Sequence, residues 1–132
     1  MTAAKRTVRV VAAQIERGDR YLITQRRPTA SLPLLWEFPG GKVEEGEADE
    51  AALMRELKEE LDIDCAVRER VLSVEHEYAD YIVSLHTYRV ELVKGEVKPR
   101  KVHDCRWVRA DELDQYEFPS ADQRSVEALL KD

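Results

Sequence analysis

The sequence predicts an α/β fold in which helices cover a mixed β-sheet. Several segments rich in Val, Ile, Tyr and Leu are bounded by turn residues, which is typical of β-strands. Two other segments have the composition and periodicity of helices. The chain has 132 residues, 43% of them hydrophobic, which suffices for one compact core but is too short for two ordinary domains. We therefore expect a single domain over residues 1–132.

The first part of the chain is predicted to form a β-hairpin and a loop. Val8, Val10 and Ala12 alternate with other residues before the Gly18-Asp19 turn, and an apolar run follows it, which indicates a hairpin over residues 7–24. After a loop at 28–33, a short extended segment at 35–38 runs into the break Pro39-Gly40-Gly41.

A helix is predicted over residues 48–61. This segment consists almost entirely of good helix formers, and Asp49 and Glu50 suit the positive end of the helix dipole. Paired strands are then expected at 65–75 and 81–94. The remaining expected elements are a short strand at 105–108, a helical turn at 110–113 and a closing amphipathic helix at 121–130.

Charge and cysteine content exclude several classes of protein. The 21 basic and 27 acidic residues give a net charge of −6, which disfavours a protein that binds the backbone of DNA or RNA. No run approaches the roughly 18 uncharged residues of a membrane helix, and no clear cleavage site follows the first residues, so we expect neither a membrane partner nor secretion. Cys65 and Cys105 are too few and too separated for a disulfide framework, which favours reduced thiols and a cytoplasmic location.

The predicted helix at 48–61 combines an apolar face with an acidic arc. Glu56, Glu59 and Glu60 share about 100° of its circumference, and the pair Glu56 and Glu60 stands at i and i+4, where like charges repel. One interpretation is a solvated helix face. The other is a site for a hard cation such as Mg²⁺, which takes carboxylate and phosphate oxygens. The expected apolar face comprises Ala51, Leu53, Met54, Leu57 and Leu61.

The glycines just before this helix favour the second interpretation. A tight turn at Gly40-Gly41-Lys42 lets the backbone approach a ligand or a metal. A Walker phosphate-binding loop is excluded, because Trp36 stands where its first glycine belongs and Val43 replaces the Ser or Thr after the lysine.

Residues 41–63 resemble the signature of the Nudix hydrolase family, G-x5-E-x7-R-E-U-x-E-E-x-G-U, where U is an apolar aliphatic residue. Every fixed position matches except Asp62, where the family has glycine. That glycine ends the helix in a left-handed turn, a conformation that Asp tolerates better than most residues. The matching residues are Gly41, Glu47, Arg55, Glu56, Leu57, Glu59, Glu60 and Ile63.

Other segments are similar to the MutT-like branch of this family, which removes oxidised or modified nucleotides from the pool. They are residues 25–27, 35–42, 107–108 and 116–122. The resemblance implies a Nudix-fold α/β/α sandwich that hydrolyses a nucleoside triphosphate to the monophosphate and pyrophosphate. The implied cofactor is Mg²⁺, with Mn²⁺ as an alternative.

The resemblance also implies a set of metal-site residues. Glu56 and Glu60 would be the principal ligands, Glu59 a further ligand or base, and the carbonyl of Gly41 would complete the shell. The remaining pair, which would orient these carboxylates, is Glu47 and Arg55. Many relatives supply one more acid at the position of Lys101, and the residues here that could replace it are His103 and Asp104.

For the substrate, the resemblance implies that Phe38 lies against the nucleoside and that Asp122 reads the edge of the base. Arg26 or Arg27 is expected to contact the triphosphate, since guanidinium pairs well with phosphate oxygens. The alternative for Asp122 is an N-cap of the last helix. Because the MutT pattern has Asn at this position, the preferred base stays open.

We expect a small-molecule nucleotide as substrate, no nucleic acid polymer, and a monomer or a homodimer. The favoured substrate is an oxidised purine nucleotide such as 8-oxo-dGTP. The alternative is CTP or 5-methyl-dCTP, which Asp122 also suits. A non-catalytic nucleotide-sensing module is less favoured, because the glutamates of the signature are intact.

Overall fold

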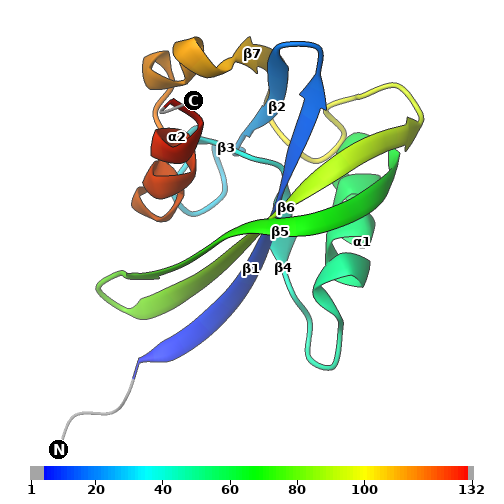
Figure 1. Ribbon diagram of the computed structural model, residues 1–132. Helices are drawn as coiled ribbons and strands as arrows, with labels where there is room; N and C mark the ends of the chain where they lie inside the picture. Colours follow the sequence, from blue (N-terminus) through cyan, green and yellow to red (C-terminus); the bar gives the residue numbers. More distant parts are fainter. Residues whose placement is uncertain (1–4, 131–132) are drawn as a thin grey trace, which may run out of the picture.

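A mixed β-sheet of seven strands forms the middle layer of the fold (Figure 1). The computed structural model describes residues 5–130, apart from the side chains of Arg124 and Leu130. The strands are β1 (Arg6–Arg17), β2 (Arg20–Gln25), β3 (Trp36–Glu37), β4 (Gly40–Lys42), β5 (Asp64–Glu77), β6 (Tyr81–Lys94) and β7 (Asp104–Arg109).

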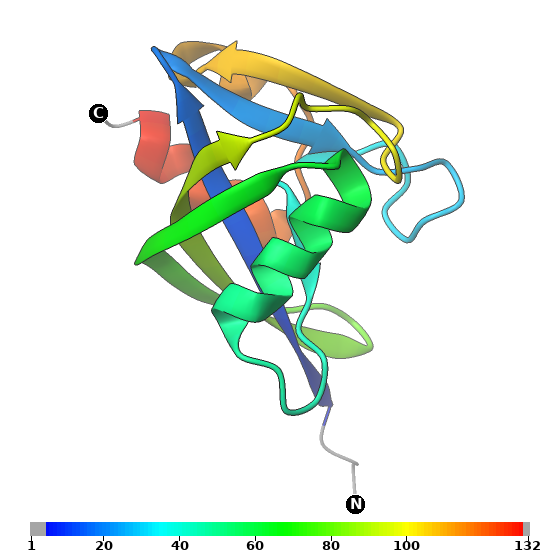
Figure 2. The ribbon, with the colours of Figure 1, turned by 90° about the vertical axis from the view of Figure 1, so that its right-hand side faces the viewer.

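Helices cover both faces of this sheet (Figures 1 and 2). The helix α1 (Asp49–Leu61) lies on one face, and α2 (Gln123–Leu130) lies on the other with the short 3-10 helices η1 (Ala110–Gln115) and η2 (Ser120–Asp122). The predicted α/β/α sandwich is confirmed. No helix in the described part of the chain has the length and apolar character needed to cross a membrane.

The strand β1 organises the sheet because it pairs with three others. It runs parallel to β6 up to Ile15, which lies beside Val90. Its middle pairs antiparallel with β4, and its last two residues pair with β2. The hairpin predicted at 7–24 is therefore present, but its strands pair only beside the turn. Beyond it, β2 pairs with β3 and β7 instead.

The other predicted elements are present with small differences at their ends. The helix predicted at 48–61 begins at Asp49, and the predicted paired strands are β5 and β6. The closing helix differs most, because η2 precedes α2. The backbone N–H of Asp122 donates to the carbonyl of Pro119 at 2.9 Å, a contact three residues back that tightens this turn.

Two apolar cores lie on opposite sides of β1, as alternation along a strand requires. Val11, Ala13 and Ile15 pack with the leucines of α1, whereas Ala12 faces the core beneath α2. The central strand is therefore buried on both faces.

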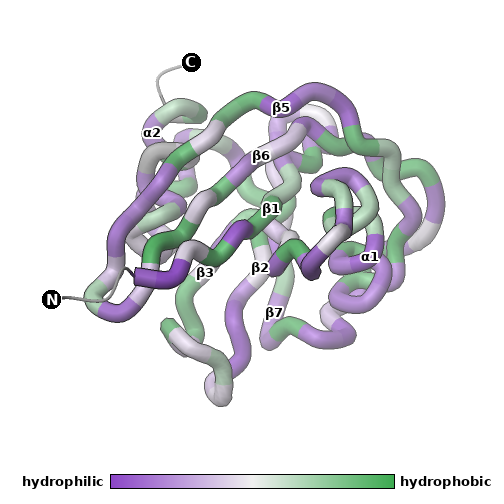
Figure 3. The backbone as a smooth tube through the Cα atoms, turned by 90° about the horizontal axis from the view of Figure 1, so that it is seen from below, coloured by the Kyte–Doolittle hydropathy of each residue, from purple (hydrophilic) through white to green (hydrophobic). Residues whose placement is uncertain are grey.

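The buried face of α1 is shifted from the predicted one. Its leucines are buried, but Ala51 is exposed and Met54 is 44% exposed, while Ala52 is buried instead. At 100° per residue, a face that runs from the leucines to Ala52 includes the positions of Glu56 and Glu60. The predicted separation of acidic arc and apolar face is therefore wrong for these two glutamates. Figure 3 shows hydrophobic and hydrophilic residues mixed along α1.

The helix α1 ends at Asp62 in the left-handed conformation, with φ 58° and ψ 40°. The backbone N–H of Asp62 donates to the carbonyl of Lys58 at 3.1 Å. Asp62 therefore takes the conformation that the resemblance implied for the family's glycine.

Candidate active site

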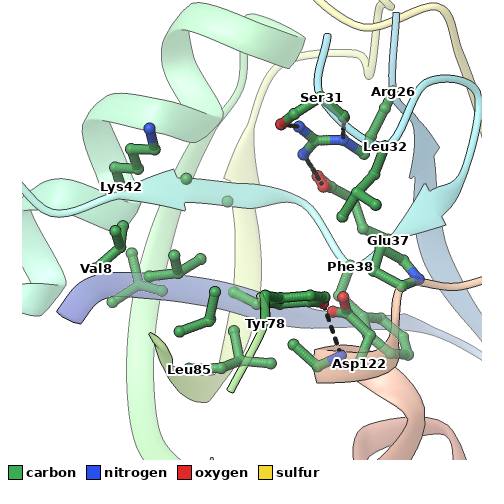
Figure 4. Close-up of a pocket in the computed structure, with 18 of the residues that line it drawn as sticks. Val8, Arg26, Ser31, Leu32, Glu37, Phe38, Lys42, Tyr78, Leu85 and Asp122 are labelled. Atoms are coloured by element: carbon green, nitrogen blue, oxygen red, sulfur yellow. Dashed lines mark hydrogen bonds and ion pairs between the residues drawn. The ribbon is translucent and has the colours of Figure 1, made fainter. Parts of the chain in front are cut away.

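A pocket of about 340 Å³ lies alongside β1 (Figure 4). Its walls come from segments that are far apart in the sequence. They are β1 itself, parts of the segment 26–42, Glu60 of α1, residues of the β5–β6 hairpin and the turn at 119–122. The fold thus brings the signature helix and the C-terminal turn to one cavity.

Glu56 lies directly against the backbone of β4. A Cβ atom at position 41 would meet the carboxyl group of Glu56, so only the absence of a side chain at Gly41 permits this contact. Gly41 is held in place because it pairs with Val11 of β1. The structure therefore brings together Gly41 and Glu56, as the sequence predicted.

Glu60 lies one turn further along α1 and lines the pocket. Burial, reinforced by the charges of Glu37 and Glu56, raises the pKa of Glu60 to about 9. Among the side chains that the structure describes, no basic one forms an ion pair with it, and the nearby Arg26 and Arg55 pair with Glu37 and Glu56. An ionised carboxylate at this position requires a counter-charge.

Arg55 connects the loop before α1 to the acidic face. Its Nε and Nη2 donate to the two carboxylate oxygens of Glu47, each at 2.9 Å, and its Nη1 donates to Oε1 of Glu56 at 2.7 Å. The Arg55 guanidinium holds the pKa of Glu47 down to about 2. The predicted contact of Glu47 with Arg55 is therefore present, and it ties Glu56 into the same network.

The donor set fits a hard divalent cation, although it does not enclose one. Among the described residues, no three acidic, His or Cys side chains converge to form a complete metal site. Glu59 is 46% exposed at its side chain and lies 3.7 Å from Arg55 Nη1. Of the α1 carboxylates, Glu60 lines the pocket, while Glu56 lies against Gly41, which also lines it. A cation such as Mg²⁺, which keeps several waters, needs only such a partial set.

The pocket holds a second pair of carboxyl groups, Glu37 and Asp122, and the charge of Glu37 acts on Glu60 as well as on Asp122. Asp122 is 9% exposed, and burial together with the charge of Glu37 raises its pKa to about 8. Glu37 is partly buried, with 24% of its side chain exposed, and burial raises its pKa as well. The Nη1 of Arg26 donates to both oxygens of Glu37 at 2.9 and 3.0 Å, which offsets part of this charge (Figure 4).

Of the other residues predicted to contact the substrate, Phe38 and Arg26 line the pocket and Arg27 does not. Phe38 lines the pocket but is only 2% exposed, and its ring packs against Phe118. Arg26 also lines the pocket, but its guanidinium is already bonded to Glu37 and to Ser31. Arg27 donates to the carbonyl of Arg100 instead and is not part of the lining.

Lys101, at the position of the missing acid, lies near the end of α1, whereas the candidates His103 and Asp104 lie beside Gln25 of β2. The backbone N–H of Lys101 donates to the carbonyl of Glu60 at 3.1 Å, while its side chain is exposed. His103 is also exposed, and its backbone N–H is bonded to Gln25. The carboxylate of Asp104 accepts the N–H of Cys105 at 2.8 Å.

Two residues of the pocket were missed by the sequence analysis. Glu37 lies in the segment that resembles the MutT-like branch, and the signal was a single acid between two aromatic residues, Trp36 and Phe38. Tyr78 follows β5 at the turn to β6, and the only signal was an aromatic residue next to a turn.

Comparison with known proteins identifies the family of the chain. The family model described as NUDIX domain matches residues 10–128. The CTP pyrophosphohydrolase of Escherichia coli is 38% identical over 123 residues, which cover 93% of this chain and 91% of the relative. The 8-oxo-dGTP diphosphatase of Haemophilus influenzae is 37% identical over 130 residues, which cover 97% of this chain and 95% of the relative.

Solved structures support the same assignment. The solution structure of a MutT protein of the Nudix hydrolase family from methicillin-resistant Staphylococcus aureus superposes with a TM-score of 0.78 at 38% identity, covering 97% of this chain and 98% of that one. The matched region contains both the signature helix and the turn that carries Asp122. The chain therefore belongs to the Nudix hydrolase family, in its MutT-like branch.

Proposed function

We propose that this enzyme is a nucleoside triphosphate pyrophosphohydrolase that converts a (d)NTP and water to the (d)NMP and pyrophosphate. The observation that carries the proposal is the pocket that is lined both by Glu60 of α1 and by the buried Asp122. A nucleotide has the matching chemistry, because its phosphates bind metal ions and its base carries hydrogen-bonding groups. Under this proposal a single-domain protein, monomeric or homodimeric, works in the cytoplasm on the nucleotide pool.

Nudix hydrolases require a divalent cation, and we propose Mg²⁺, with Mn²⁺ as an alternative. Glu56 and Glu60 would hold it, with Glu59 as a further ligand or base and the carbonyl of Gly41 as an additional oxygen. When bound, such an ion neutralises charge on the phosphate chain and activates or orients the attacking water. The chain's own contribution is to keep these oxygens in place, since Arg55 fixes Glu56 and links it to Glu47.

The carboxyl group of Asp122 would select the substrate. With its pKa raised to about 8, Asp122 is protonated at neutral pH and can both donate and accept a hydrogen bond. A purine edge such as that of 8-oxo-dGTP offers both a donor and an acceptor. We therefore favour an oxidised purine nucleotide, with Phe38 against the nucleoside and Arg26 or Arg27 towards the triphosphate.

The second candidate is CTP or 5-methyl-dCTP. It is favoured by the 38% identity to an enzyme that acts on CTP and by the carboxyl group at position 122, because a carboxylate accepts a hydrogen bond from the amino group of cytosine. The amino group and the ring N3 of cytosine are likewise a donor beside an acceptor, so the protonated form of Asp122 suits this base too.

A substrate screen tests the proposal. The enzyme with Mg²⁺ is given 8-oxo-dGTP, dGTP, CTP, 5-methyl-dCTP and UTP, and pyrophosphate and orthophosphate are measured separately. We expect pyrophosphate to be released at different rates for the different bases, and to fall to background when EDTA removes the metal. Release of orthophosphate alone, or binding without turnover as in a sensing module, would contradict it.

A further inference from the structure

The turn after β5 is joined to the turn that carries Asp122 by one side chain, Tyr78. The backbone N–H of Tyr78 donates to the carbonyl of Tyr81 at 2.8 Å, and the two rings stack with centroids 5.2 Å apart. The ring of His76 packs edge-on against Tyr78, with centroids 4.7 Å apart. These contacts fix the position of the Tyr78 ring at the tip of the β5–β6 hairpin.

The hydroxyl of Tyr78 reaches across the pocket to the other turn. Its Oη accepts the backbone N–H of Ala121 at 3.1 Å (Figure 4). Ala121 is 5% exposed, so its N–H has little access to water and depends on this acceptor. Ala121 immediately precedes Asp122, and both belong to the three-residue helix η2.

Few other bonds hold this short turn. The N–H of Asp122 donates to Pro119 at 2.9 Å, and the side chain of Gln123 donates to Phe118 at 3.0 Å. Both of these bonds are local, whereas that from Ala121 to Tyr78 joins residues 43 positions apart. It therefore fixes where the turn sits relative to the wall of the pocket.

We propose that Tyr78 is a positioning residue for base selection, because its hydroxyl holds the 120–122 turn and thereby sets the position of the Asp122 carboxyl group. The inference rests on the proposed role of Asp122 in reading the base. Hydrogen bonds weaken steeply when distance and angle change, so a small displacement of the turn lowers the difference in affinity between two bases. Tyr78 thus controls selectivity from the turn after β5, which carries no residue of the Nudix signature.

The test compares Tyr78→Phe with the wild type. This variant keeps the ring that lines the pocket and removes only the acceptor of the Ala121 N–H. Two quantities are measured: amide hydrogen exchange at Ala121, and the ratio of the Kd values for 8-oxo-dGMP and CMP in the presence of Mg²⁺. We expect faster exchange at Ala121 and a Kd ratio that moves towards one by roughly 3- to 10-fold, the range set by one hydrogen bond.

Tyr88→Phe is the matched control. Its hydroxyl donates to the carboxylate of Asp49 at 2.6 Å, beside α1 and outside the pocket. The control loses a comparable hydrogen bond, so it reports any general loss of stability. The control should leave the Kd ratio unchanged. After correction for global stability, amide exchange at Ala121 should also be unchanged.

The outcomes separate this inference from the proposed function. An unchanged Kd ratio in Tyr78→Phe, or a wild type that binds both monophosphates equally, overturns the positioning role. The same holds if Tyr88→Phe changes the ratio as much as Tyr78→Phe does. If the wild type does not turn over any triphosphate, the proposed function is refuted. The Kd ratios of Tyr78→Phe and wild type still decide the positioning role, because binding of a monophosphate requires no hydrolysis.

Discussion

Two pairs of carboxyl groups at the pocket are built in different ways. The first, here called the α1 carboxylates, consists of Glu56 and Glu60 on one helix. The second, the base-end carboxylates, consists of Glu37 from β3 and Asp122 from η2. In all four the pKa is raised, and burial is the main cause. Both pairs therefore require something that offsets negative charge.

The comparison shows that similar groups are neutralised by different means. The periodicity of one helix places the α1 carboxylates beside each other, so a single divalent cation can serve both. In the second pair, Arg26 already pairs with Glu37, and Asp122 has its pKa near 8. We infer that the first pair is completed by a metal and the second by a proton.

The largest effect is expected from Glu60→Gln in the first pair. The substitution keeps the size of the side chain but removes the charge that binds metal, so kcat should fall at least ~100-fold. Without metal the fold should stay intact, because the pKa of Glu60 is raised to about 9, so the side chain is already uncharged at neutral pH and Gln has the same size. Steady-state kinetics and thermal melts measure both effects. The control is Glu50→Gln, which replaces an exposed acid on the same helix. Near-normal turnover of Glu60→Gln would exclude Glu60 as a metal ligand.

A smaller effect is expected from Glu47→Gln, which disturbs the α1 carboxylates indirectly. The bidentate contact with Arg55 is lost, so Arg55 no longer holds Glu56 in a fixed position. Activity or metal affinity should fall roughly 10- to 100-fold, as for other residues that orient ligands. Titration with Mg²⁺ measures this, and Glu45→Gln in the same exposed loop is the control. If both variants lose activity equally, the contact has no orienting role.

In the second pair, Asp122→Ala should change selectivity. It leaves the base without its partner and should cost roughly 1 to 3 kcal/mol of discrimination, measured as the ratio of kcat/KM for two bases. Asp122→Asn should retain or enhance action on 8-oxo-dGTP and flatten the pH dependence of kcat/KM, since Asn donates and accepts at every ordinary pH. Unchanged ratios with a lower Tm in both variants would instead identify Asp122 as a helix cap.

The smallest expected effect is on stability. The folded-state pKa of Asp122 is about 8, above its ordinary value of 3.8, so ionisation opposes folding. The contribution of this group is fully present below the ordinary pKa and is lost as the pH rises through 8. The Tm advantage of Asp122→Asn over wild type should therefore grow between pH 5 and 8 and level off above that. Melts in EDTA across pH 5 to 9 measure this, and a constant difference would show that Asp122 titrates normally.

Most of the fold follows from local sequence signals. The helix at 48–61 and the strands around it were predicted because their residues have strong local preferences. The pairing of β1 could not be predicted, because the parallel contact with β6 depends on residues that are far apart in the chain. The rotation of α1 was also missed, because packing against the sheet rather than composition decides which face is buried.

The two pairs of carboxyl groups differ in the same way. The α1 carboxylates were predicted, since their spacing within one helix and the neighbouring glycine carry the information. Asp122 was identified only by resemblance. Glu37 and Tyr78 were not identified at all, because only the folded chain brings β3, the β5–β6 hairpin and η2 together. When a site is assembled from separate turns, no single turn has a sequence pattern that predicts it.

The parallel pairing of β1 with β6 also affects how the chain is synthesised. During translation β1 leaves the ribosome long before β6, so Val11, Ala13 and Ile15 lack their partner strand until Val90 and its neighbours have emerged. At roughly 5 to 20 residues per second, this interval lasts several seconds. An apolar strand exposed for that time is a natural target for chaperones. The strand β1 is thus synthesised before the other strands of the sheet but gains its parallel partner late.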